Sequence, residues 1–108
     1  MAVEIEAIHS GRKDDSGKLR YDLLPPDWLD GLAQVITHGA EKYGDNNWQQ
    51  VPHGEDRYYA AAMRHINSLR SGNVTDTDSG IHHAYHAAID ILMWAYHIEL
   101  NKEDDYIL

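Results

Sequence analysis

Apolar residues recur with the spacing of an amphipathic helix in three stretches of the chain. A proline fits the first turn of a helix without the loss of a hydrogen bond, and a glycine is a common stop just after one. No segment alternates apolar and polar residues as a half-buried strand would. The pattern predicts helices from near Pro26 to Gly44, from Glu55 or Asp56 to Arg70, and from about Ser79 to Asn101.

Turn-forming residues separate these helices, in the segments GDNNWQQVPHG and NVTDTDSG. The charged segment that ends at Arg20 contains two Ser-Gly pairs, so we expect residues 1–20 to form an extended or mobile arm. Residues 21–108 then make a single domain, because a chain of 108 residues is too short for two cores and a linker. The expected fold is all-α, a small bundle of three to four helices.

Helices this short bury little apolar area within one chain. The last predicted helix also carries Leu92, Met93 and Trp94, which add apolar surface. We therefore expect a homo-oligomer, in which further copies of the chain complete the bundle.

Charge and cysteine content narrow the possible partners. The chain has 18 acidic and 9 basic residues, and a field of this sign repels nucleic-acid polymers but leaves room for a small anion bound by local cations. Cysteine is absent, so histidines and carboxylates are the remaining metal ligands, as suits a reducing cytoplasm. No apolar run approaches the roughly 20 residues that span a membrane, and no signal-peptide pattern is present. We expect a cytoplasmic protein without membrane contact.

Four polar residues share one narrow arc of the last predicted helix, and most of their neighbours are apolar. This histidine–aspartate seam consists of His83, His86, Asp90 and His97. A solvated face would use lysine and glutamate instead. Either the histidines satisfy one another inside the core, or His86 and Asp90, four residues apart, share a metal ion, a water molecule or a proton.

The middle helix places Arg57 and Arg64 on one face, with His65 beside them. The planar guanidinium group suits phosphate oxygens, so this pair is either a phosphate clamp or two surface arginines that pair with carboxylates.

A second candidate cluster follows the end of the first helix. Lys42, Tyr43, Asn47 and Trp48 supply a cation, two aromatic faces and an amide, a mixture that can stack on a nucleobase and hydrogen-bond to it. The alternative is a capping turn with a core tryptophan.

Two further pairs of polar residues have simpler interpretations. Asp76 and Asp78 precede the last helix, where capping is favoured over cation binding. His38 and Glu41 project onto the polar side of the first helix, so we expect them at the surface.

Four segments of the chain, taken in order, resemble the phage dATP/dGTP diphosphohydrolase N-terminal domain family, which is related to MazZ. They are DSGKLRYDLLPP, THGAEKYGDNNW, RYYAAAMRHINSLRSG and DTDSGIHHAYHAA. The resemblance runs from about Asp15 to Ile98. It implies a nucleotide-binding domain that cuts a purine deoxynucleoside triphosphate between its α and β phosphates, with Mg²⁺ or Mn²⁺, in the host cytoplasm if the chain is phage-encoded. Asp78 stands where relatives usually place glutamate. The matching positions are Lys42, Tyr43, Asn47, Trp48, Arg57, Arg64, His65, Asp76, Ser79, Gly80, His83 and His86.

On this resemblance Arg57, Arg64 and Lys42 would hold phosphates, and Tyr43 or Trp48 would contact the base. The candidate catalytic residues are His83, His86 and Asp78, and the candidate metal ligands are Asp76, Asp78, His83, His86 and Asp90. MazG-type relatives bind magnesium through an ExxE pair followed by ExxD, a quartet that this sequence lacks. The alternative hypothesis is therefore a nucleotide sponge, which sequesters a nucleotide signal without turnover.

Overall fold

The computed structural model describes residues 10–107 and the side chains of residues 10–102. Within this range the fold is all-helical, with three α-helices and no strand, which confirms the predicted fold class. The elements are a 3₁₀ turn η1 (Tyr21–Leu23), helix α2 (Pro26–Tyr43), a 3₁₀ turn η2 (Asn47–Gln50), helix α3 (Gly54–Arg70) and helix α4 (His83–Ile107).

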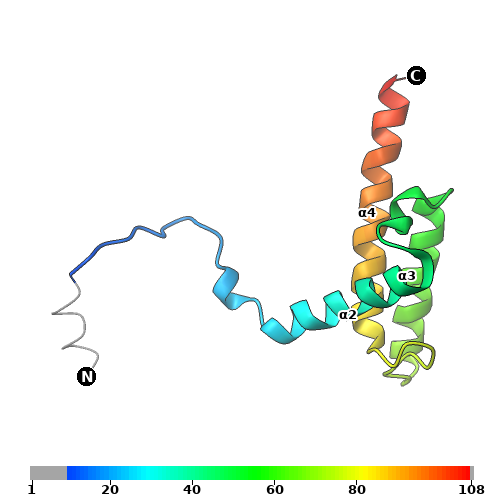
Figure 1. The fold of residues 1–108 in the computed structure, drawn as a ribbon, viewed down its shortest axis with the longest axis horizontal. Coiled ribbons are helices and arrows are strands. Elements are labelled where there is room, and N and C mark those ends of the chain that lie inside the picture. The colour runs from blue at the N-terminus through cyan, green and yellow to red at the C-terminus, as the bar shows by residue number, and fades with distance from the viewer. Residues whose placement is uncertain (1–9, 108) are drawn as a thin grey trace.

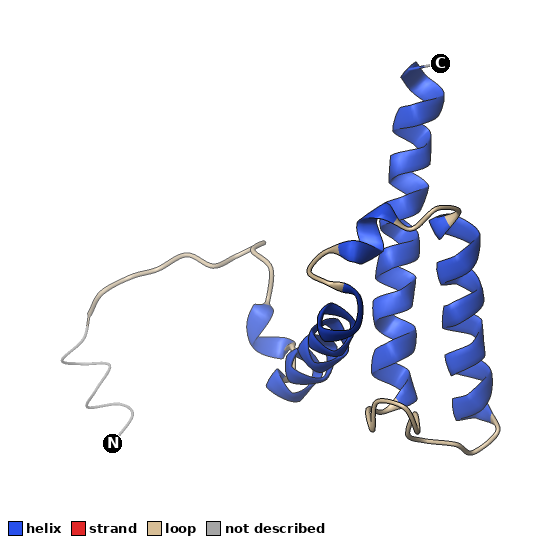
Figure 2. Cartoon of the chain, turned by 45° about the vertical axis from the view of Figure 1, so that its right-hand side comes forward, coloured by secondary structure: helices blue, strands red, loops and turns tan. Residues whose placement is uncertain are grey.

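Helices α3 and α4 lie side by side and antiparallel, and α2 packs across α4 (Figures 1 and 2). Residues 10–25 extend away from this body (Figure 1), and residues 10–20 form neither helix nor strand and are exposed. The first nine residues of the predicted N-terminal arm lie outside the described residues.

Two glycines set how closely the helices pack. A Cβ atom at Gly31 would overlap the ring of Tyr85, and one at Gly54 would overlap the ring of His97. The missing side chains thus let α2 approach α4 at Gly31 and let α3 begin against α4 at Gly54.

The start of α2 at Pro26 and the end of α3 at Arg70 confirm the predicted boundaries, and α3 begins one residue earlier than expected. Gly44 terminates α2 with φ 97°, a backbone conformation that favours glycine, and its N–H donates to the carbonyl of Ala40.

The predicted start of the last helix at Ser79 is wrong, because α4 begins at His83. Residues 76–81 instead form a turn, in which the Asp76 N–H donates to the Ile81 carbonyl and the Gly80 N–H donates to the Asp76 carbonyl, with Gly80 at φ 74°. The hydroxyl of Ser79 bonds to the Asp76 carboxylate and is thereby held in this turn. The helix also continues past the predicted end at Asn101 to Ile107.

The core within one chain is small. Among the described residues, its buried hydrophobic side chains are Val35, Ala62, Ala87 and Ile89. Many large apolar side chains of α2 are exposed, Trp28 by 54% and Leu29 by 56%. No described helix is both long enough and apolar enough to cross a membrane.

Candidate functional site

A cavity of about 470 Å³ opens between the C-terminal half of α2, the η2 segment, α3 and α4. It brings together most of the residues that the sequence singled out, although they come from five separate parts of the chain. The predicted residues that line it are Lys42, Tyr43, Asn47, Trp48, His65, Asp76, Asp78, His86 and Asp90.

One end of the cavity is aromatic and amide-rich. The Tyr43 side chain is 65% exposed, and the Lys42 ammonium lies 5.7 Å from the centre of its ring. The Trp48 ring meets Tyr96 edge-on, with centroids 4.9 Å apart, and the Trp48 carbonyl lies 2.8 Å from Nε2 of His97. Trp48 therefore combines both interpretations of this cluster, because it is packed against α4 and still lines the cavity.

Lys42 and Asp78 form an ion pair in the wall of the cavity. Lys42 Nζ donates to Asp78 Oδ2 at 3.1 Å, and His38 Nε2 lies 3.5 Å from the same oxygen. The hydrogen bond and charge of Lys42 hold the pKa of Asp78 below its usual range, and Asp78 raises the pKa of Lys42. The placement of His38 at the outer surface was wrong, because its half-buried side chain lines the cavity one helical turn before Lys42. Glu41 is exposed, as predicted.

Ser79 fixes two site residues at once. Its N–H and its hydroxyl both donate to Asp76 Oδ2, at 2.9 and 2.8 Å. The same hydroxyl accepts the Ile81 N–H at 3.1 Å and lies 2.6 Å from His86 Nε2. A hydroxyl has one proton and two lone pairs, so His86 must donate from Nε2 and keep its own lone pair at Nδ1.

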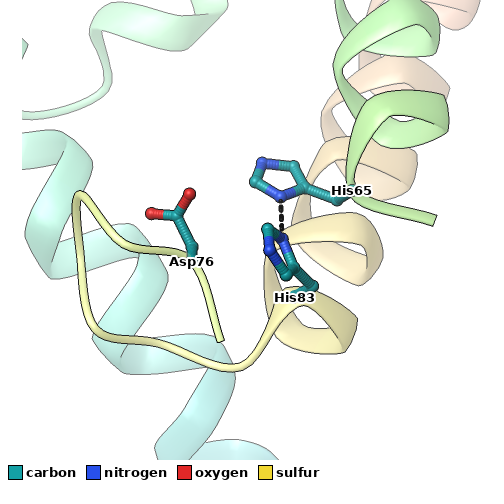
Figure 3. A group of neighbouring side chains, drawn as sticks. All are labelled: His65, Asp76 and His83. Carbon is teal, nitrogen blue, oxygen red and sulfur yellow. Dashed lines mark hydrogen bonds between the residues drawn. The ribbon is translucent and has the colours of Figure 1, made fainter. Parts of the chain in front are cut away.

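Three ligand atoms converge beside this turn, from His65 on α3, Asp76 in the loop and His83 at the start of α4 (Figure 3). They all lie within 4.8 Å of one another, and the two Nδ1 atoms of the histidines are 2.8 Å apart. The His65 ring also stacks on His86, with centroids 4.5 Å apart.

Burial and hydrogen bonding shift the pKa values of the residues in this cluster. It lowers the pKa of His65 and of His86, and the neighbouring imidazoles lower the pKa of His65 further. Burial alone would raise the pKa of Asp76, but the hydrogen bonds from Ser79 and the nearby imidazoles bring it below its usual value. Neutral imidazoles beside an ionised carboxylate are donors that suit a divalent cation, so these residues fit a metal ion.

Asp90 lies one helical turn beyond His86 on α4. Its side chain is only 15% exposed, and its Oδ2 lies 3.8 Å from His65 Nε2. Burial raises the pKa of Asp90 to about 7, against a smaller opposing effect of Arg64. Asp90 therefore takes up and releases a proton near neutral pH.

The structure does not bring every predicted residue into the cavity. Arg57 and Arg64 are exposed and do not line it, and Arg57 donates to the Pro52 carbonyl at 3.2 Å. His83 is 7% exposed and lies behind His65, outside the lining residues. His97, at the far end of the seam, is 4% exposed and stacks on Tyr58, so it belongs to the core.

Four polar or aromatic residues that line the cavity were not among the site candidates from the sequence. They are His38, Asp45, Asn46 and Tyr58. His38 precedes Lys42 by four positions, and this spacing puts the two on one face of α2, a signal that was present in the sequence. Tyr58 shares the apolar face of α3 with Ala62 and Ile66, and nothing in that spacing indicates that this face meets a cavity.

The chain matches the profile of a family described as "dATP/dGTP diphosphohydrolase, N-terminal" over residues 9–106. It is also similar to a dATP/dGTP diphosphohydrolase of Salmonella phage PMBT28, with 36% identity over 83 residues. The aligned region is 77% of this chain and 28% of that relative, so the chain spans less than a third of the relative's length. No solved structure matches the chain.

Proposed function

Because the chain belongs to the dATP/dGTP diphosphohydrolase N-terminal family, we propose that it binds a purine deoxynucleoside triphosphate in the 470 Å³ cavity and cleaves it between the α and β phosphates. The products are the deoxynucleoside monophosphate and pyrophosphate. The observation that carries this proposal is the composition of the cavity, which has aromatic and amide groups at one end and a carboxylate–imidazole cluster at the other.

The base would occupy the end formed by α2 and η2. Tyr43 offers an exposed ring for stacking, and Trp48 provides a second, better-fixed aromatic wall. The amides of Asn46 and Asn47 line the same end and can donate to and accept from the edge of a purine.

The phosphates would extend toward Lys42 and the cluster. Lys42 is the lysine among the lining residues, and it already pairs with Asp78. The lining also includes Asp45, Asp76 and Asp90, so the cavity repels a triphosphate unless a cation intervenes. A divalent metal ion, once bound, supplies that charge and lowers the pKa of the attacking water.

His86 is suited to receive the proton of the attacking water. Ser79 takes its Nε2–H, which leaves the Nδ1 lone pair to accept a proton. Burial lowers the pKa of His86, which favours the neutral imidazole that can accept a proton. Arg57 and Arg64 would reach the phosphates only after a rearrangement of their exposed side chains.

A homo-oligomer is also part of this proposal. Exposed apolar side chains extend from η1 along α2 and recur on α4 at Leu92, which is 58% exposed. A second copy packed on α2 would bury these side chains, and multi-angle light scattering that gave a monomer would contradict it.

The test of the activity is to incubate the chain with each of the four dNTPs and Mg²⁺ or Mn²⁺ and to separate the products by anion exchange. We expect a monophosphate and pyrophosphate, with dGTP or dATP the best substrate. Lys42→Gln should slow the reaction, whereas Lys102→Gln, which alters an exposed lysine of α4 outside the cavity, should not. Tight binding with intact triphosphate recovered after denaturation would instead indicate sequestration.

A further inference from the structure

The cluster of His65, Asp76 and His83 draws its ligand atoms from three separate segments of the chain, α3, the 71–82 loop and α4. Burying these three polar groups together costs free energy unless each has a hydrogen-bond or metal partner, because buried polar groups lose their contacts with water. Figure 3 shows the two imidazoles turned toward each other and the Asp76 carboxylate projecting into the same space.

The distance between the Nδ1 atoms of His65 and His83 suits both a hydrogen bond and a shared metal ion. At 2.8 Å, one Nδ1 must donate a proton to the other when no cation is present. Two nitrogens bound to one ion at about 2.1 Å lie about 3.0 Å apart at an octahedral angle and about 3.4 Å apart at a tetrahedral angle. A cation can therefore replace the shared proton when the two nitrogens move apart by about half an ångström.

His65 and Asp76 can each offer a ligand atom. A His65 ring that turns its Nδ1 lone pair to a cation carries its proton on Nε2, and Nε2 lies 3.8 Å from Asp90 Oδ2, which is beyond hydrogen-bond distance. Both hydrogen bonds from Ser79 to Asp76 end on Oδ2, which leaves Oδ1 for a cation.

The donor set selects the kind of ion. Two imidazoles and one carboxylate suit first-row transition metals, whereas Mg²⁺ prefers an octahedral shell of oxygens. We propose that His65, Asp76 and His83 bind a divalent transition metal ion, such as Mn²⁺, Co²⁺ or Zn²⁺, in preference to Mg²⁺. This inference rests on the proposed function, and it deepens it by naming the ligands and the class of metal.

The test uses the full chain, freed of metal with a chelator and titrated with Co²⁺ alone. Visible absorption reports histidine ligation of cobalt, and equilibrium dialysis with elemental analysis reports the stoichiometry. We expect a single Co²⁺ per chain, displaced by Zn²⁺ and not by a large excess of Mg²⁺. Absence of binding, or equal displacement by Mg²⁺, overturns the proposal.

Variants identify the ligands. His65→Gln and Asp76→Asn should each weaken Co²⁺ binding by more than about 100-fold, the upper end of the loss caused by removal of an outer-shell partner. His83 is buried, so His83→Gln is interpreted only if circular dichroism shows native helix content, and the other two variants carry the test without it.

Two controls remove the same chemical groups elsewhere. His53→Asn deletes an exposed imidazole at φ 56°, a conformation that asparagine tolerates. Asp30→Asn deletes an exposed carboxylate of α2 that does not line the cavity. Both should bind Co²⁺ as the unaltered chain does, and a loss in either equal to that of Asp76→Asn would refute the ligand assignment.

Metal binding and turnover can fail separately. If Co²⁺ binds as described and no dNTP is cleaved, the metal site stands and the proposed function fails. If dNTPs are cleaved with Mg²⁺ alone and His65→Gln retains that activity and its Mg²⁺ dependence, the function stands and the assignment of the metal site fails.

Discussion

The charge of Asp90 opposes folding in the metal-free chain, and Asp90→Asn tests how strongly. The pKa of this carboxyl is raised from 3.8 to about 7, because its side chain is 15% exposed. The shift is about 3 pKa units, and each unit corresponds to about 1.4 kcal/mol between the two protonation states. The ionised form therefore lowers the free energy of unfolding by about 4 kcal/mol at most.

The direction in which stability changes with pH follows from the raised pKa of Asp90. Between about pH 4 and 7 the folded chain binds this proton while the unfolded chain has lost it. The contribution of Asp90 to stability is thus fully present below about pH 4 and is lost as the pH rises through about 7. At pH 5 the penalty is about 2 kcal/mol, and at pH 8 it approaches the full value of about 4 kcal/mol.

Asparagine has nearly the same shape and no charge, so Asp90→Asn should raise the free energy of unfolding by about 2–3 kcal/mol more at pH 8 than at pH 5. The assay is urea unfolding followed by circular dichroism, with chelator present and protein concentration fixed. The cost of burying the amide is the same at both pH values and cancels in the difference. Asp30→Asn, which changes an exposed carboxylate of α2, should show no such difference. An equal gain at both pH values would refute the reasoning.

Three further substitutions test the packing and the site. Gly31→Ala should lower the free energy of unfolding by about 1–3 kcal/mol, because its methyl group overlaps a tyrosine ring of α4. Gly39→Ala, in open space on the same helix, should raise it by about 0.5–1 kcal/mol, and urea unfolding measures both. Ser79→Ala releases Asp76 and should weaken Co²⁺ binding by about 10- to 100-fold, whereas Ser71→Ala should leave the cobalt titration unchanged. Tyr43→Ala should raise the KM for dGTP by about 10-fold in steady-state kinetics, since a stacked base contributes about 1–3 kcal/mol, and an unchanged KM would place the base elsewhere.

Local signals were enough to predict most of the fold. Proline at the start of α2, glycine after its end and the apolar period of α3 act within a few residues, and the structure has those boundaries within one residue. The start of α4 was misplaced, because the four residues before it follow a helical pattern while their backbone is held in a turn by Asp76 and Ser79. A side chain that bonds to the backbone three residues away competes with the helix, and periodicity does not register that competition.

The candidate site shows the same division between local and long-range information. The seam was predicted from the phase of one helix, but its two ends meet different parts of α3. His83 and His86 face His65, whereas His97 packs over Gly54 and is enclosed there. The helical period places both ends of the seam on one face of α4. Only the way α3 packs on α4 determines that one end forms a candidate metal site and the other a core histidine. The cavity therefore depends on the antiparallel register of these two helices, which Gly54 sets at one end and the imidazole pair at the other.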